Sequence, residues 1–192
     1  MSPGDTRLLY TALVGLVGLE RLVELAISRR HLRRALARGG VVEGPASRRR
    51  SVAFHVTFLA ACPLEAWGLD RPWRPALGFA MLTVLAITMA LRYWAVGTLG
   101  ERWNIWVVCV PGDATVTGGP YRWLRHPNYL AVLFEVPALA LVHGAWFTAA
   151  AFGIGNVLLL AQRIRLEEGL LCRHTDYERT MADRSRLLPR FR

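Results

Sequence analysis

Three polar side chains near the C-terminal end of the sequence have a spacing that could place them in one chemical site. Asn156, Arg163 and Glu167 stand seven and four residues apart in "FGIGNVLLLAQRIRLEEGLL". On a helix that turns about 100° per residue, these side chains fall within a stripe about 40° wide, while Arg165 and Glu168 point elsewhere. An Arg and a Glu four apart could also form only a surface ion pair, worth tenths of a kcal/mol. Asn156 favours a functional site, because it carries the stripe into an apolar block where an unsatisfied amide is expensive.

A second polar cluster lies where a turn gives way to an apolar helix, in "GPYRWLRHPNYLAVLFE", residues 119–135. Pro127 suits the first turn of a helix, so we expect His126 or the residue just before it at its cap. The free N–H groups and the positive end of such a helix favour an anion, for example a carboxylate. Gly118 and Gly119, just before, permit close approach of the backbone to a ligand. The segment predicts an anion-binding site, and the alternative is interfacial anchoring by its Arg and Trp side chains.

Acidic side chains also occur within the first apolar block. Glu20 and Glu24 are four residues apart on one helix face, and Arg21 lies three residues before Glu24. An ion pair within the helix would lower the cost of placing charge near lipid. Two interpretations remain open: a buried network that fixes this helix against its neighbours, or side chains that line a substrate cavity.

The cysteines do not indicate a metal site or a disulfide framework. Cys62, Cys109 and Cys172 are few and widely separated in the sequence. We therefore expect packing roles for them and no bound metal.

Apolar blocks must form the elements that position these groups. The sequence has 192 residues, of which 53% are hydrophobic, and a lipid-spanning helix needs roughly 20 residues. The first three blocks are long enough, and the last two, joined by His143–Gly144, are expected to form a tight helical hairpin that extends beyond its apolar run. The first block lacks a basic leader and a small-residue cleavage site, so it is expected to remain as a span. The blocks are Leu8–Ile27, Val52–Leu69, Ala76–Val96, Leu130–Val142 and Ala145–Ala161.

The basic residues predict how such a protein sits in the membrane. All 24 are Arg, with eight in the first loop and eight after the fifth block. With five spans, these two regions share one side with residues 97–128, whereas the N-terminus and the loop near Asp70 face the other side. The positive-inside rule places the Arg-rich side in the cytoplasm, where anionic lipid headgroups explain the net charge of +10. Nucleic acid is not expected as a partner, since no stacking or groove-reading motif accompanies the charge.

The predicted fold is therefore an all-α integral membrane protein with about five transmembrane helices, multi-pass in the cell membrane. We interpret residues 1–192 as a single domain, with three spans in 1–96 and the functional part in 97–192. After the third span, "VPGDATVTGGPY" predicts irregular backbone or a small hairpin lying over the membrane, and a further helix follows at the C-terminus.

These motifs together resemble a known family. The sequence "DATVTGGPYRWLRHPNY", followed farther along by "RIRLEEGLL", is similar to the integral-membrane methyltransferases of the isoprenylcysteine carboxyl methyltransferase family, which are related to phospholipid N-methyltransferases. The resemblance covers roughly Leu91 to Phe191 and includes the terminal "YERTMADRSRLLPRF". It implies that S-adenosyl-L-methionine binds at the cytoplasmic face and that a lipophilic acceptor enters from the bilayer.

The resemblance also implies roles for individual residues. Glu167 corresponds to the cofactor-binding acid, and Arg163 corresponds to the catalytic arginine near the acceptor. Trp106 departs from the family pattern, which has a polar cofactor contact there, and "RHTDY" departs from a common Phe-Gly turn. The remaining cofactor-binding positions implied by the strand-like segment, the Gly/Pro turn and the HPxY motif are Asp113, Ala114, Thr115, Val116, Gly119, Tyr121, His126, Pro127, Asn128 and Tyr129.

The chemistry of methyl transfer suits this set of residues. Transfer from a sulfonium is an in-line displacement, which needs an aligned nucleophile and a dry site but no covalent enzyme intermediate. Arg163 could hold an ionised carboxylate, phenolate or enolate, while Glu167 binds the amino end of the cofactor. Because Glu168 points to another face, we expect it to matter less for cofactor binding than Glu167.

The acceptor is predicted from the first span. Its "ERLVELAISRRHLRRAL" resembles the bacterial branch of the family that methylates hydroxyls of long-chain alkylresorcinols or alkylpyrones. We therefore expect O-methylation of a lipophilic phenol or enol, with Arg163, Asn156 and Glu24 contacting the acceptor. Carboxyl methylation of an isoprenylated cysteine is the second interpretation, and N-methylation of a phosphatidylethanolamine headgroup is the third. A membrane carrier or scaffold without catalysis is the non-enzymatic alternative, and the oligomeric state stays open.

Overall fold

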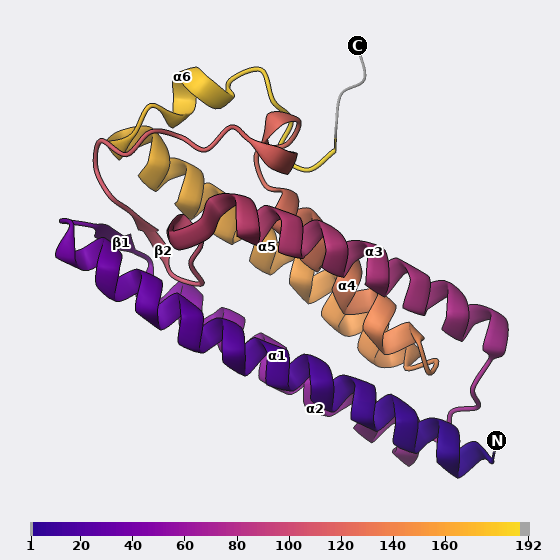
Figure 1. Ribbon diagram of the computed structural model, residues 1–192. Coiled ribbons are helices and arrows are strands. Elements are labelled where there is room, and N and C mark those ends of the chain that lie inside the picture. Colours follow the sequence, from indigo (N-terminus) through magenta and orange to yellow (C-terminus); the bar gives the residue numbers. More distant parts are fainter. Residues whose placement is uncertain (1, 189–192) are drawn as a thin grey trace.

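The structure is a computed structural model that describes residues 2–188, and it is mostly helical. Five long helices run alternately up and down in sequence order (Figure 1). The first two lie side by side and face a group formed by the other three, and a short helix α6 (Tyr177–Met181) follows them. The long helices are α1 (Pro3–Ala37), α2 (Pro45–Gly68), α3 (Pro75–Leu99), α4 (Pro127–Leu141) and α5 (Trp146–His174).

Proline marks where four of these helices begin. Its fixed φ and missing N–H suit the first helical position, where the backbone N–H has no partner within the helix. The expected helix after "RH" does begin at Pro127, with His126 at its cap. The expected hairpin is also confirmed, because α4 ends at Leu141 and α5 begins at Trp146 after a short turn.

Within residues 2–188, two helices are long and apolar enough to cross a membrane by length and composition. One is α5. The other is α3 with its continuation to Arg102. Helix α4 is apolar but shorter. Large apolar side chains point outward along them, among them Ile87, Ile154 and Leu158, each more than 60% exposed. Apolar side chains that face outward in this way are suited to contact with lipid rather than with water. The predicted number of five spans stays a prediction.

A two-stranded sheet ties the first loop to the segment after α3. Strand β1 (Val41–Glu43) pairs antiparallel with β2 (Val107–Cys109), and Val41 lies opposite Cys109. The sequence predicted irregular backbone or a local hairpin after α3, and the irregular backbone is found from residue 110 to 118. The strand in this region instead pairs with a segment more than sixty residues earlier in the sequence. Both segments lie at the same end of the helices as the C-terminal segment (Figure 1).

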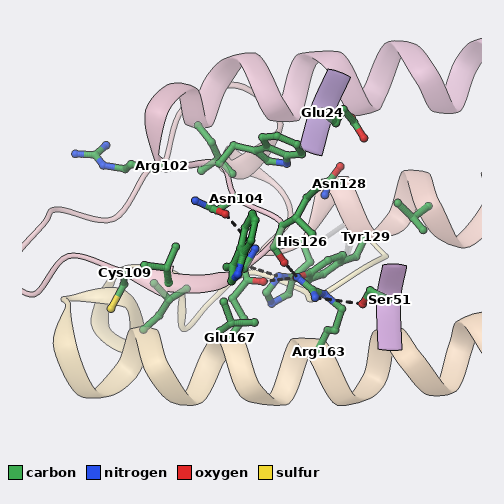
Figure 2. A pocket seen from close by; sticks show the side chains of 18 of the residues that line it. Glu24, Ser51, Arg102, Asn104, Cys109, His126, Asn128, Tyr129, Arg163 and Glu167 are labelled. Carbon is green, nitrogen blue, oxygen red and sulfur yellow. Dashed lines mark hydrogen bonds and ion pairs between the residues drawn. The ribbon is translucent and has the colours of Figure 1, made fainter. Parts of the chain in front are cut away.

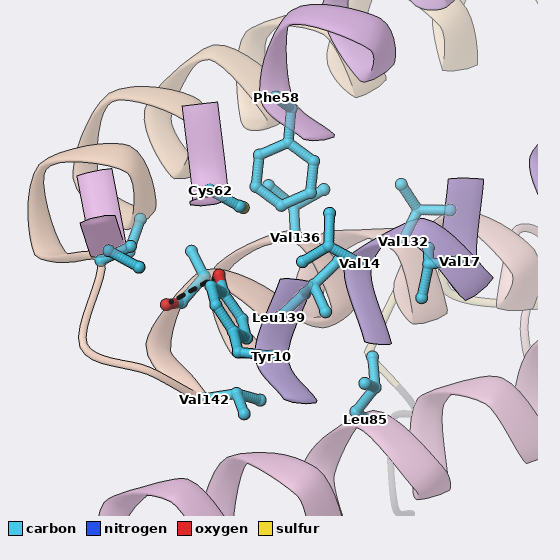
Figure 3. Close-up of a cluster of buried hydrophobic side chains, with 14 of the residues drawn as sticks. Tyr10, Val14, Val17, Phe58, Cys62, Leu85, Val132, Val136, Leu139 and Val142 are labelled. Carbon is cyan, nitrogen blue, oxygen red and sulfur yellow. Dashed lines mark hydrogen bonds between the residues drawn. The ribbon is translucent and has the colours of Figure 1, made fainter. Parts of the chain in front are cut away.

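The main apolar core contains residues from all five long helices (Figure 3). Tyr10 from α1 and Cys62 from α2 lie there, both almost fully buried. Cys109 is also buried, as a packing role requires, whereas Cys172 is exposed and does not fit that expectation. Other members of this core are Val14, Val17, Phe58, Leu85, Val132, Val136, Leu139 and Val142.

A buried ionic network crosses the bundle near its middle. Arg21 donates to Glu24 at 2.7 Å and also contacts Glu135 of α4. Arg92 of α3 forms two bonds to the same Glu24 carboxylate, at 2.9 and 2.6 Å. The predicted pairing of Arg21 with Glu24 is thus confirmed, and the network joins α1, α3 and α4. Removing one member would leave a buried charge uncompensated, which costs about 3–5 kcal/mol.

A carboxylate from α2 caps the beginning of α5. The backbone N–H groups of Phe147 and Thr148 donate to Glu65 at 3.2 and 2.7 Å. Arg71 also donates to Glu65, at 3.1 and 2.8 Å. A negative group at the positive end of a helix is favourable, so this contact fixes α5 relative to α2.

Candidate functional site

A cavity of about 340 Å³ lies between the α1–α2 pair and the group of α3, α4 and α5. At the end formed by the loops it is lined by charged groups, including Arg38, Arg102 and Asp113. Deeper in the bundle its walls are apolar, with Leu59 and Leu160. The cavity therefore connects a polar mouth to an apolar interior between the helices.

Most of the residues predicted from the sequence line this one cavity. Figure 2 shows several of them converging from α1, α4 and α5. Two predicted residues, Gly119 and Pro127, are not among the cavity walls. The predicted residues that do line it are Glu24, Asp113, Ala114, Thr115, Val116, Tyr121, His126, Asn128, Tyr129, Asn156, Arg163 and Glu167.

Gly119 has a different role from the one expected. We predicted that it lets the backbone approach a ligand, but it faces helix α3. Its φ is +51°, and a Cβ atom added there would lie 2.3 Å from the Thr98 hydroxyl oxygen. Only glycine fits both the left-handed conformation and this close contact. Gly119 thus packs the short 3-10 helix Gly119–Arg122 against α3, and Pro127 is buried at the beginning of α4.

Arg163 is buried and held in one orientation by several elements (Figure 2). Its Nη1 donates to the Ser51 hydroxyl at 3.2 Å, and its Nη2 donates to the Ile105 carbonyl at 2.8 Å. The guanidinium also lies 5.9 Å from the centre of the Tyr129 ring. Two guanidinium donors are therefore fixed to the protein, and the remaining N–H groups stay available to a ligand.

The segment that carries the Ile105 carbonyl is itself attached to α1. The buried Ser28 hydroxyl donates to Asn104 at 2.6 Å and accepts from the Ile105 N–H at 2.8 Å. Asn104 also accepts from the Trp106 N–H at 3.0 Å. These bonds position the carbonyl that orients Arg163, and they could not be predicted from local sequence patterns.

The stripe on α5 faces the cavity as its spacing predicted. Glu167 accepts a hydrogen bond from the Tyr129 hydroxyl. Asn156 is fully buried, and its Nδ2 donates to the Val132 carbonyl at 3.0 Å. Because a carbonyl can only accept, this bond fixes the orientation of the amide. The Asn156 Oδ1 then remains an acceptor without a partner within residues 2–188, as does the Oδ1 of Asn128.

Glu168 does not line the cavity, as expected, but it contacts a residue that does. It lies 3.2 Å from Nε2 of His126, and Arg186 donates to its two oxygens at distances between 2.7 and 3.1 Å. The Tyr177 hydroxyl lies 3.4 Å from the same His126 nitrogen. His126 is therefore oriented by Glu168. That Glu168 matters less than Glu167 for cofactor binding stays a prediction.

The C-terminal segment binds the backbone just before α4. The N–H groups of Arg125 and His126 donate to the carbonyls of Ser185 and Arg186 at 2.9 and 3.0 Å. Predicted family positions from 189 to 191 lie outside the described residues. This clamp holds the helix start that the sequence singled out.

The irregular segment before this helix is held by the same C-terminal part. Thr115 donates to the Asp176 carboxylate through its hydroxyl, at 2.5 Å, and through its N–H, at 2.9 Å. These hydrogen bonds lower the pKa of Asp176 below its ordinary value of 3.8, so the carboxylate stays charged to a lower pH than a free aspartate would. The backbone that lines the mouth of the cavity is fixed in this way.

Ion pairs cross the mouth of the cavity. Arg38 at the end of α1 lies 2.6 Å from Asp113, and Arg102 lies 3.6 Å from the same carboxylate. Trp106, which departs from the family pattern, lies in the cavity wall with the Arg48 guanidinium 4.8 Å from its ring centre. Asp113 thus faces two guanidinium groups, which limits its freedom to bind a cation.

Comparison with known proteins agrees with the sequence motifs. Residues 80–173 match the model of the isoprenylcysteine carboxyl methyltransferase (ICMT) family. The chain is 30% identical over 164 residues to the uncharacterized protein YpbQ of Bacillus subtilis. The aligned region covers 85% of this chain and 96% of YpbQ. It is 27% identical over 152 residues to an uncharacterized protein of Haemophilus influenzae, covering 79% of this chain and 88% of the other.

Proposed function

The chain belongs to the isoprenylcysteine carboxyl methyltransferase family of integral-membrane methyltransferases, and we propose that it transfers a methyl group from S-adenosyl-L-methionine to a hydroxyl of a lipophilic acceptor. The proposed acceptor is a phenolic or enolic hydroxyl of a long-chain alkylresorcinol-type or alkylpyrone-type polyketide. In the proposed topology five helices span the cell membrane, and the mouth of the cavity faces the cytoplasm.

The observation that carries this proposal is one cavity that joins two different environments. Its charged mouth suits a water-soluble cofactor, and its apolar depth suits the chain of a lipid. Arg163 and Glu167 lie in the wall on one face of α5, one turn apart. A cofactor and a lipid could therefore meet in line at these two residues, with little water between them.

The residues present fit S-adenosyl-L-methionine. The Asn128 Oδ1 is a buried acceptor without a partner within residues 2–188, and Glu167 offers a carboxylate to an ammonium group. The first N–H groups of α4 have no side-chain cap, which leaves them free for a carboxylate. When bound, the cofactor supplies a methyl group activated by a sulfonium. Glu167, Asn128 and the beginning of α4 would hold its amino acid end.

The acceptor would contact the deeper wall. Arg163 can donate to an oxyanion and so stabilise a phenolate or enolate before it attacks the methyl carbon. Asn156 offers an unpaired acceptor to a second hydroxyl, and Glu24 lies across the cavity on α1. Leu59 and Leu160 form apolar walls for the alkyl chain.

The test is an assay that does not assume the acceptor. Purified protein is incubated with a lipid extract and cofactor carrying a radioactive methyl group, and the labelled lipid is identified. A labelled ether of a phenol or enol is expected. A labelled carboxyl ester or a labelled amine headgroup would contradict the proposed acceptor. The protein is also titrated with the cofactor in a calorimeter. If no binding is detected, the protein is a carrier or scaffold instead.

A further inference from the structure

His55 on α2 is a cavity residue to which neither the sequence motifs nor the cofactor assignment gives a role. It lines the cavity one turn deeper than Ser51, which binds Arg163 through its hydroxyl. The Nδ1 of His55 lies 2.8 Å from the Ser51 carbonyl oxygen. The imidazole and the Arg163 guanidinium are thus attached to the same residue and face the same cavity.

The hydrogen bond at Nδ1 determines what the other ring nitrogen can do. A carbonyl oxygen can only accept, so Nδ1 must carry the proton. In the neutral ring, Nε2 then carries a lone pair, and it makes no hydrogen bond within residues 2–188. In a histidine that works as a base, one ring nitrogen is typically held by a hydrogen bond that fixes the tautomer, and the other nitrogen takes the proton.

We infer that His55 is the general base of the proposed reaction, and this inference rests on the proposed function. Nε2 takes the proton from the acceptor hydroxyl, and the oxygen, stabilised by Arg163, forms a bond to the methyl carbon. The bond between that carbon and the cofactor sulfur breaks, and its electron pair stays on sulfur. The products are a methyl ether, the demethylated cofactor and an imidazolium, which returns its proton to water through the mouth of the cavity.

The other basic groups in the cavity wall are already engaged. Glu24 accepts hydrogen bonds from Arg21 and Arg92, and Glu167 accepts one from Tyr129. The presence of a free base also favours one class of acceptor. A carboxyl group is ionised at neutral pH and needs no base, whereas a phenol, with a pKa of about 10 for the tyrosine hydroxyl, does.

Charged groups on the neighbouring helices act electrostatically on His55. They are Arg21 on α1, Arg92 on α3 and Glu135 on α4, with Arg163 on α5 joined to it through Ser51. A pH profile measured on a His55 variant will contain any titration of these groups. The test therefore compares two acceptors on the same variant, so that such effects cancel.

The experiment uses His55→Gln in the full-length protein with two probes, a long-chain meta-alkylphenol and the same phenol carrying an acidifying nitro group. General-base catalysis contributes about 100-fold or more, so the variant should lose at least that much rate with the plain phenol at neutral pH. The loss should shrink to a few-fold with the nitrophenol, which is ionised without help. Raising the pH should restore the rate with the plain phenol.

A second readout does not depend on turnover. The nitrophenol absorbs differently when ionised, so its bound spectrum reports the fraction held as phenolate by the protein. His55→Gln should lower that fraction at a pH near the pKa of the free probe, while cofactor affinity in a titration stays within about twofold of the wild-type value. His31→Gln is the matched control, because His31 also bonds a carbonyl, that of Trp103, but does not line the cavity.

Equal losses with both phenols, or full activity of His55→Gln with the plain phenol, would overturn the role of His55. A wild-type protein that methylates neither phenol but does methylate a prenylated cysteine would instead overturn the proposed function, and with it the need for a base. The two failures are therefore distinguished by the wild-type protein alone.

Discussion

At the scale of single residues, Arg163 is expected to act on the acceptor rather than on cofactor affinity. Its guanidinium is fixed by Ser51 and Ile105, and the planar fork can hold an oxyanion with its remaining donors. Arg163→Lys keeps the charge but loses the fork, so methyl-transfer turnover should fall about 10–100-fold, equivalent to roughly 1.4–2.7 kcal/mol. Cofactor affinity in a titration of the same sample should be nearly unchanged. Arg165→Lys, on an exposed face of α5, is the control.

The same scale separates the two adjacent acids. Glu167→Gln should weaken cofactor binding without changing stability, because Glu167 lines the cavity. Glu168→Gln should lower both thermal stability and cofactor affinity, since it releases His126 and leaves Arg186 without its partner. Losing a hydrogen bond to a charged group costs about 1.5–3 kcal/mol. A Glu168→Gln protein with wild-type melting temperature and affinity would show that His126 does not need this support, and Arg186→Gln should behave like Glu168→Gln.

At the scale of elements, the position of α5 depends on the Glu65 cap. Glu65→Gln removes the charge that faces the first N–H groups of α5 and Arg71, which should cost about 1–3 kcal/mol. The measurement is a thermal melt in detergent, in which a drop of several degrees is expected. Glu43→Gln is the comparison, because its ion pair with Arg173 is exposed and such pairs contribute little. Equal melting temperatures for the two variants would argue against the cap.

Elements also show what the sequence could and could not predict. The face shared by Asn156, Arg163 and Glu167 follows from helical spacing alone, and the helix start at Pro127 follows from local chemistry. Contacts between distant segments left no such local signal. The pairing of β1 with β2 and the contact of Glu168 with Arg186 join segments that lie apart in the sequence. The packing of Gly119 against α3 could not be predicted either, because its partner Thr98 lies about twenty residues earlier.

At the scale of the whole molecule, the loop after α1 and the segment after α5 should lie on one side of the membrane. Both segments lie at the same end of the helices (Figure 1). Single cysteines at positions 38 and 179, both exposed, should react with an impermeant thiol reagent from the cytoplasmic side, and one at the exposed position 74 from the other side. The background needs Cys172→Ser, because Cys172 is exposed. Labelling of positions 38 and 179 from opposite sides would rule out five spans.

The central claim is that this cavity methylates the hydroxyl of a membrane-dissolved phenol or enol. Its most direct test is a defined reaction: purified protein in lipid bilayers, a long-chain alkylresorcinol, and S-adenosyl-L-methionine whose methyl group carries deuterium. Mass spectrometry should find a deuterated methyl ether of the alkylresorcinol, formed by the wild-type protein and reduced about 10–100-fold by Arg163→Lys. A protein that binds the cofactor but yields no ether of any phenol or enol supplied, while it methylates a carboxyl or an amine, would contradict the claim.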